Sequence, residues 1–204
     1  MKLTIEDTYL VDQGRKMHDL YKVQLYLTQK GKEIYGPDFF ISPAQNNVII
    51  SLFVYAKNVE EELQKRGIDP QKGLLLMGKS GCGKTSIFHL LKPFFNSKMK
   101  YDIKSCKIIA QDFSYKGYEA LQPFWSENAR VTVLDNLGAE PQGRHYGNLC
   151  DVVPTLIERY YENRTEQKIP KLHITTQLNP AELEKKYGIG FRRMLKEMFN
   201  VIVF

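Results

Sequence analysis

Residues 78–85 have the types and spacing that could hold a phosphate group. They match the pattern G-x-x-x-x-G-K-[ST], in which glycines let backbone N–H groups turn inward around phosphate oxygens. Lys84 is expected to reach the β- and γ-phosphates, and the Thr85 hydroxyl is expected to be a ligand of Mg²⁺. The pattern predicts a nucleoside triphosphate site with magnesium, formed by Gly78, Lys79, Ser80, Gly81, Cys82, Gly83, Lys84, Thr85 and Ser86.

An acidic residue on a neighbouring strand is expected to complete this site. Residues 131–134 are a short apolar run, and Asp135 follows them directly. Because ligands of parallel sheets gather at the carboxyl ends of the strands, Asp135 is assigned to magnesium through water. Gln177 follows a second apolar run, residues 172–176, and could hold the attacking water or sense the γ-phosphate.

The elements that must position these residues are expected to form a parallel sheet wrapped by helices. From about residue 72, short apolar runs alternate with longer amphipathic segments, and Asp112 and Asn179 are expected to cap helices. Runs this short and uniformly apolar are typical of strands covered on both faces. The expected strands are residues 73–77, 106–110, 131–134, 172–176 and 201–204, and the expected helices are residues 84–95, 113–121, 148–163, 181–187 and 192–199.

The first part of the chain, residues 1–71, has a different pattern. Residues 21–27 are a possible strand, a turn is expected at residues 36–38, and residues 48–66 are expected to form one amphipathic helix that ends at Gly67. We interpret residues 1–71 as an N-terminal extension packed on a core of residues 72–204, because they are too few for a typical second domain.

Five segments, taken in order, resemble the AAA+ ATPases of the DnaC/IstB type, which are bacterial and phage helicase loaders and transposition helpers. The order and spacing of the segments carry the resemblance, since the phosphate-loop pattern alone is shared by all P-loop proteins. It implies an α/β P-loop fold with a five-stranded parallel sheet, helices on both faces and no helical lid. The segments are residues 73–85, 131–138, 145–148, 174–179 and 187–200.

The resemblance also implies ATP as the nucleotide and homo-oligomers with nucleotide at the subunit interfaces. It implies action on single-stranded DNA, a replicative helicase or a transposase. The sequence departs from the family where Asn136 replaces a second acidic residue and Gln177 replaces the usual asparagine. At two positions near the C-terminus where members of the family often have arginines, this sequence has a glycine and a methionine. Arg192 and Arg193 are therefore the remaining candidates for an arginine finger.

Composition adds weaker constraints. The formal net charge of +6 is compatible with a polyanionic partner, and the three cysteines show no disulfide or zinc spacing, which suits a reducing cytoplasm. The longest apolar stretch is too short to span a membrane. A group of basic and aromatic residues could follow a single strand of DNA, although a solvated edge with its rings in the core is the simpler interpretation: Lys92, Phe94, Phe95, Lys98, Lys100, Tyr101, Lys104 and Lys107.

Three functions follow from these observations. The favoured one is an AAA+ ATPase that acts in DNA replication or transposition. Its hydrolysis is expected to be slow if Asn136 stands in place of the catalytic acid, although Glu140 is close enough in sequence to substitute as the base. The second is a nucleotide-sensing adaptor that binds ATP with little hydrolysis. The third is a small-molecule kinase or a GTPase, because residues 135–138 also spell the D-x-x-G of GTPases. The sequence lacks the N-K-x-D that reads guanine, and its arginines are too dispersed for a kinase lid.

Overall fold

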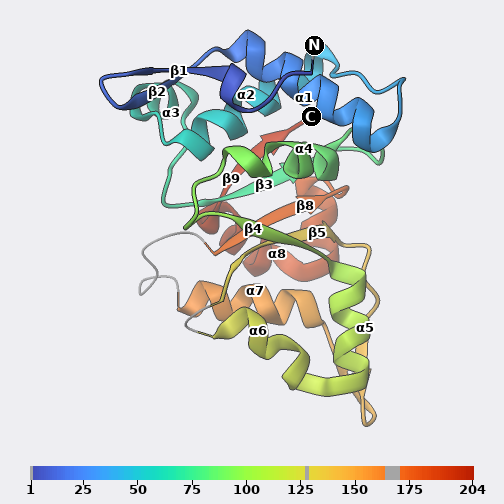
Figure 1. Ribbon diagram of the computed structural model, residues 1–204. Helices are drawn as coiled ribbons and strands as arrows, with labels where there is room; N and C mark the ends of the chain where they lie inside the picture. The colour runs from blue at the N-terminus through green and yellow to red at the C-terminus, as the bar shows by residue number, and fades with distance from the viewer. Residues whose placement is uncertain (1, 127–128, 164–170) are drawn as a thin grey trace.

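Five parallel strands form the central sheet, in the order β4-β5-β8-β3-β9 (Figure 1). This sheet confirms the predicted α/β class with a five-stranded parallel sheet. The computed structural model describes residues 2–126, 129–163 and 171–204. The strands are β3 (Gly73–Met77), β4 (Tyr101–Ser105), β5 (Val131–Leu137), β8 (Leu172–Thr176) and β9 (Phe199–Val203).

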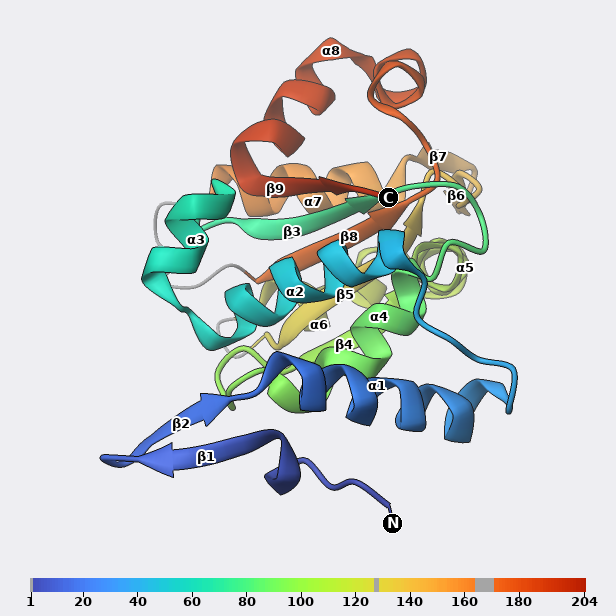
Figure 2. The same cartoon turned by 90° about the horizontal axis from the view of Figure 1, so that it is seen from above.

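Helices cover both faces of the sheet, as predicted (Figures 1 and 2). Successive side chains of a strand point to opposite faces, so Leu74 and Leu76 join one core cluster and Leu75 and Met77 join the other. The first cluster is covered by α1 (Leu20–Tyr35), α2 (Pro43–Lys57), α3 (Glu60–Arg66) and α4 (Lys84–Leu91), and the second by α5 (Cys106–Lys116), α6 (Gln122–Trp125), α7 (Val152–Glu162) and α8 (Pro180–Met198).

Shorter elements connect these layers. An N-terminal hairpin projects beside α1, and a second hairpin lies beside α5 (Figures 1 and 2). No described helix combines the length and apolar character needed to cross a membrane. The remaining elements are η1 (Glu6–Thr8), β1 (Tyr9–Asp12), β2 (Arg15–His18), η2 (Lys92–Phe94), η3 (Gly117–Leu121), β6 (Gly143–His145) and β7 (Asn148–Cys150).

Residues 21–27 lie within α1, so the strand predicted there is wrong. The Asp19 carboxylate accepts hydrogen bonds from the backbone N–H groups of Tyr21 and Lys22 and thereby caps the helix. Val23 and Leu27 are buried four residues apart, on one face of the helix. The apolar run that suggested a strand is the buried stripe of a helix.

Residues 48–66 form parts of two helices instead of the single helix predicted. Asn58 adopts a left-handed conformation, with φ of 51°, and separates α2 from α3. Gly67, with φ of 62°, ends α3, as predicted. The α1 and α2 helices share a core cluster with β3 and α4. The division of the chain after residue 71 stays a prediction.

The strand predicted at residues 106–110 is wrong, because these residues begin α5. Cys106, Ala110 and Phe113 are buried at helical spacing. The strand is β4, five residues earlier, at the edge of the sheet. Polar residues interrupt this strand, so it has no apolar run that would mark it in the sequence. Asp102 pairs with surface basic groups, and Lys104 is exposed.

Other boundaries also shift. Asp112 lies inside α5 and caps no helix, whereas Asn179 caps α8 as predicted, with Pro180 in the first turn. The helix predicted at residues 148–163 begins only at Val152, after β7. The two helices predicted at residues 181–187 and 192–199 form one element, α8, which is kinked at Gly188 (φ 89°).

Candidate nucleotide site

The loop between β3 and α4 lies at the carboxyl edge of the sheet, where β5, β8 and β3 are neighbours. Gly81 and Gly83 adopt φ values of +79° and +97°, which L-residues with side chains rarely adopt. A Cβ at Gly83 would lie 2.4 Å from the Gln45 amide nitrogen, and one at Gly78 would lie 2.8 Å from Cβ of Phe204. The loop therefore requires glycine at these positions.

The Lys84 side chain turns back into this loop and is buried. Its ammonium donates hydrogen bonds to the carbonyl oxygens of Gly78 (2.6 Å) and Lys79 (2.9 Å). A buried ammonium needs such acceptors, because an unpaired charge in a protein interior is costly. The loop thus holds one positive charge among its own carbonyl groups.

Asp135 lies beside this loop, within β5. Its Oδ1 accepts hydrogen bonds from the hydroxyls of Thr85 (2.6 Å) and Thr175 (2.7 Å). The Thr175 hydroxyl also accepts a hydrogen bond from the backbone N–H of Asn136 at 2.8 Å. Thr175 is fully buried on β8 and fixes both the carboxylate and the backbone that follows it.

Thr175 did not emerge from the sequence as a site residue. It lies two positions before Gln177, so strand alternation places it on the same side of the chain, and this spacing was the available signal. Gln177 donates a hydrogen bond from Nε2 to Oδ1 of Asn136 at 2.9 Å. Asn136 itself is left-handed, with φ of +65°.

The phosphate loop, the start of α4 and the ends of β5 and β8 line a pocket of about 230 Å³. The predicted residues Gly78, Lys79 and Cys82 belong to the loop but do not line this pocket. The structure brings the other predicted phosphate and magnesium residues together there, and their roles stay predictions. The lining residues are Ser80, Gly81, Gly83, Lys84, Thr85, Ser86, Asp135, Asn136, Thr175 and Gln177.

Glu140, which could have served as a base, does not line the pocket. One of its carboxylate oxygens accepts a hydrogen bond from the Gly138 backbone N–H at 2.7 Å, and the other accepts one from the Tyr187 hydroxyl. Burial, followed by this bond to Glu140, raises the pKa of Tyr187, which therefore stays a donor. The carboxylate is thus engaged with α8 and not with the phosphate loop.

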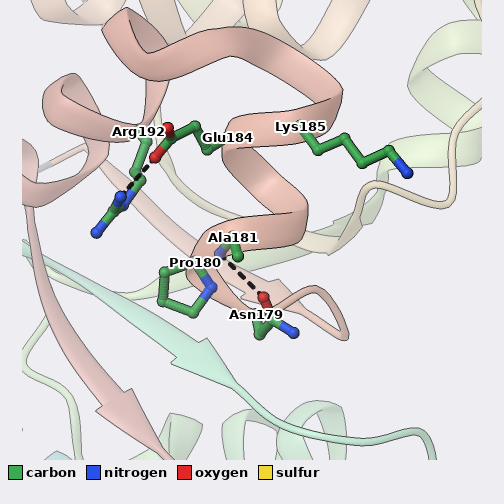
Figure 3. A pocket seen from close by; sticks show the side chains of 6 residues that line it. All are labelled: Asn179, Pro180, Ala181, Glu184, Lys185 and Arg192. Carbon is green, nitrogen blue, oxygen red and sulfur yellow. Dashed lines mark hydrogen bonds and ion pairs between the residues drawn. The ribbon is translucent and has the colours of Figure 1, made fainter.

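Arg192 and Arg193 also lie on α8 and do not line the phosphate pocket. Arg192 faces a separate surface pocket, where its guanidinium pairs with Glu184 at 2.5 Å (Figure 3). Arg193 is exposed. The structure therefore does not join either arginine to the nucleotide site of its own chain.

The basic and aromatic group around η2 has no accessible rings. Phe94, Phe95 and Tyr101 are buried, with exposures of 1%, 3% and 0%. The solvated edge with its rings in the core, the simpler interpretation, is therefore confirmed for this group.

Solved structures match the fold of this chain. No protein-family model and no curated protein matches its sequence. A proposed primosome component from Streptococcus pyogenes serotype M3 gives a TM-score of 0.57 at 16% identity, over 86% of this chain and 88% of that one. The DnaC helicase loader gives a TM-score of 0.51 at 21% identity, over 80% of this chain and 91% of that one. The chain has an AAA+ fold.

The AAA+ fold confirms the resemblance inferred from the sequence at the level of architecture. In this chain the phosphate loop follows β3, and the acidic residue comes from β5, the strand beyond β8. The pocket between them lies at the strand ends, where open parallel sheets bind their ligands.

Proposed function

We propose that this chain binds ATP with magnesium at the phosphate pocket and acts in the cytoplasm as a helicase-loader-like factor in DNA replication or transposition. One observation carries the proposal: the Thr85 hydroxyl lies 2.6 Å from the Asp135 carboxylate, beside a loop that encloses the Lys84 ammonium. The likeness of fold to the DnaC helicase loader supports the wider role.

The donors in the pocket fit both groups. Hydroxyl and carboxylate oxygens are ligands that Mg²⁺ prefers, and Thr85 and Asp135 supply them from two elements. The first turn of α4 presents free backbone N–H groups and the positive end of the helix dipole to phosphate. Bound magnesium would neutralise phosphate charge, while Lys84 would turn from the loop carbonyls to the β- and γ-phosphates.

Hydrolysis by the isolated chain is expected to be slow. Among the described residues that line the pocket, Asp135 is the one acid, and it is assigned to magnesium. The neighbouring Asn136 carries an amide, and Glu140 is bound to Tyr187. These contacts favour ATP binding with little turnover, as in a nucleotide-sensing adaptor, over a kinase or a GTPase.

The surface that we assign to single-stranded DNA is the end of the molecule formed by α5 and the β6–β7 hairpin (Figure 1). The hairpin is joined to α5 by a hydrogen bond from the Arg144 backbone N–H to the Ser114 hydroxyl, at 3.1 Å. Tyr115 is 83% exposed and Tyr146 is 92% exposed, and Lys116 and Arg144 are exposed near them. Exposed rings beside basic groups can stack with bases of any sequence.

This assignment predicts the effect of removing the rings. Replacing both tyrosines, Tyr115→Leu with Tyr146→Leu, should weaken binding of labelled oligothymidine at least about tenfold, since each stacked base contributes ~1–3 kcal/mol. Fluorescence anisotropy at fixed salt measures it. Tyr21→Leu, which removes an exposed ring from α1 in the opposite helical layer, is the matched control. Equal affinity in the double variant and the wild type would exclude this surface.

The nucleotide site itself is tested by Lys84→Ala. The variant should stay folded, because the ammonium bonds only to carbonyl groups of its own loop and to Cys82 among the described residues. ATP affinity or turnover should be lost while a circular-dichroism melt stays close to wild type. Lys98→Ala, at an exposed lysine outside the pocket, is the control. Unchanged ATP titration and turnover in folded Lys84→Ala would refute the proposed site.

A further inference from the structure

Helix α2 touches the phosphate loop through the side chain of Gln45. The side-chain oxygen of Gln45 accepts a hydrogen bond from the backbone N–H of Ser42 at 2.7 Å. Its amide nitrogen donates to the carbonyl oxygen of Cys82 at 3.0 Å. The two ends of one amide thus join the start of a helix in the N-terminal segment to the centre of the loop.

The Ser42 end of this connection is rigid. Ser42 and Gln45 form a capping box, in which the Ser42 hydroxyl also accepts a hydrogen bond from the Gln45 backbone N–H. Pro43 occupies the first turn and restricts the backbone there. A side chain held in this way does not follow movements of the loop, so it can act as a fixed point for the loop.

The bond to Cys82 sets the direction of one peptide group. In a trans peptide the C=O and the next N–H point to opposite sides. A carbonyl oxygen held toward α2 therefore directs the Gly83 N–H away from α2, and Gly83 lines the phosphate pocket. Gly83 has φ of +97° and no side chain to restrain this peptide, so the peptide would rotate more freely without Gln45.

We propose that Gln45 is a positioning residue, through which helix α2 holds the phosphate loop in its phosphate-binding conformation. The inference rests on the proposed nucleotide site and extends it to a residue outside the loop. Gln45 does not line the pocket and acts on the nucleotide only through the Cys82–Gly83 peptide. The loop N–H groups surround phosphates that ADP and ATP share. Loss of the Gln45 side chain should therefore lower the affinity for both nucleotides by the same factor.

Three variants separate this role from capping. Gln45→Met removes both hydrogen bonds of the side chain. Gln45→Glu keeps an acceptor for the Ser42 N–H, and hence the capping box, but removes the donor to Cys82. Ser42→Ala weakens the cap and leaves the Gln45 amide free to reach Cys82, so it is the matched control for helix stability.

The experiment measures ADP and ATP affinity by calorimetry and the melting temperature without nucleotide. Gln45→Met and Gln45→Glu should both bind ADP and ATP about fivefold more weakly, the factor that a lost hydrogen bond of ordinary strength produces. Ser42→Ala should melt at a lower temperature and bind both nucleotides as tightly as wild type. Gln45→Glu should melt close to wild type, which shows that the affinity loss is separate from stability.

Two outcomes would overturn the inference while leaving the nucleotide site in place. If Ser42→Ala loses as much affinity as Gln45→Met, the cap and not the loop contact is responsible. If Gln45→Glu alone loses affinity, the effect is repulsion between its charge and the phosphates. A wild type that binds neither nucleotide would instead refute the proposed function, and this inference with it.

Discussion

Asn136 is the residue at which the site departs most from an ordinary ATPase. It follows Asp135 directly, adopts a left-handed backbone and accepts a hydrogen bond from Gln177. Asparagine and aspartate both tolerate this conformation, and a carboxylate could accept the same bond. Asp is therefore the substitution that adds a base at this position with the least strain.

We predict that Asn136→Asp raises the steady-state ATPase rate without changing ATP affinity. General-base assistance typically contributes ~10² to 10⁴ in rate, and an amide cannot accept the proton of an attacking water. Asn136→Glu should also raise the rate, but it places a longer side chain at φ of +65° and is expected to cost some stability. Phosphate release under saturating ATP gives the rate. Brisk turnover by the wild type, with Asn136→Asp no faster, would show that another group is the base.

Individual site residues differed in how far the sequence could predict them. The loop residues and Asp135 were predictable because their chemistry depends on spacing along the chain and on the end of an apolar run. Thr175 and Gln45 are neutral polar residues outside the phosphate-loop motif, and their contacts with Asp135 and Cys82 span 40 and 37 positions of the sequence. Only the folded chain brings them to the site.

At the scale of elements, the buried strands were predictable and the edge strand β4 was not. The strands β3 and β8 are covered on both faces, so every residue in them is buried and the apolar run marks the element. The edge strand β4 carries Asp102 and Lys104 and has no such run. The stripe of α5 beside it is apolar at helical spacing and was mistaken for the strand.

Strand β8 also contains a buried histidine whose charge state affects stability. His173 is fully buried, and its Nδ1 accepts a hydrogen bond from the backbone N–H of Leu74 at 3.1 Å. Burial lowers its pKa from 6.5 to about 3. Four aromatic rings surround it, those of Tyr55, Phe88, Phe95 and Tyr101.

We predict that this histidine makes folding less favourable in acid. Between pH 6.5 and about 3 the unfolded chain binds a proton at His173 that the folded protein does not, so the free energy of unfolding falls as the pH drops. One such group contributes a slope of up to about 1.4 kcal/mol per pH unit. His173→Asn keeps an acceptor for Leu74 but cannot titrate. Urea unfolding across this range should show a shallower slope in the variant, and equal slopes would contradict the prediction.

At the scale of the whole molecule, the last strand, β9, is joined to the start of β3 and to the residues just before it. The Asn200 side chain on β9 donates hydrogen bonds to the carbonyl oxygens of Asp69, Lys72 and Gly73 and accepts one from the Asp69 N–H. The Tyr55 hydroxyl of α2 also reaches the Lys72 carbonyl at 2.9 Å. Sequence patterns predicted the sheet but could not predict this junction, because single polar side chains form it across distant parts of the chain.

The positions of the arginines on α8 lead to the last prediction, which concerns assembly. Arg192 lies in a surface pocket away from the phosphate site of its own chain, paired with Glu184, and Arg193 is exposed (Figure 3). A side chain in either position could reach a nucleotide bound to a neighbouring subunit. In that case the ion pair with Glu184 would open on assembly, because one guanidinium would exchange a carboxylate for a phosphate.

We predict that an Arg192→Ala, Arg193→Ala double variant binds ATP normally and has lost its turnover, since an arginine supplied in trans contributes ~10³ to 10⁵ in rate in related systems. Mixing it with Lys84→Ala protein should restore part of the activity, because some interfaces then join an intact phosphate loop to intact arginines. Each variant alone, at the same total concentration, is the control. Sedimentation with ATP and DNA establishes whether subunits assemble. If the mixture assembles and no ratio of the two variants recovers activity, neither arginine acts across the interface.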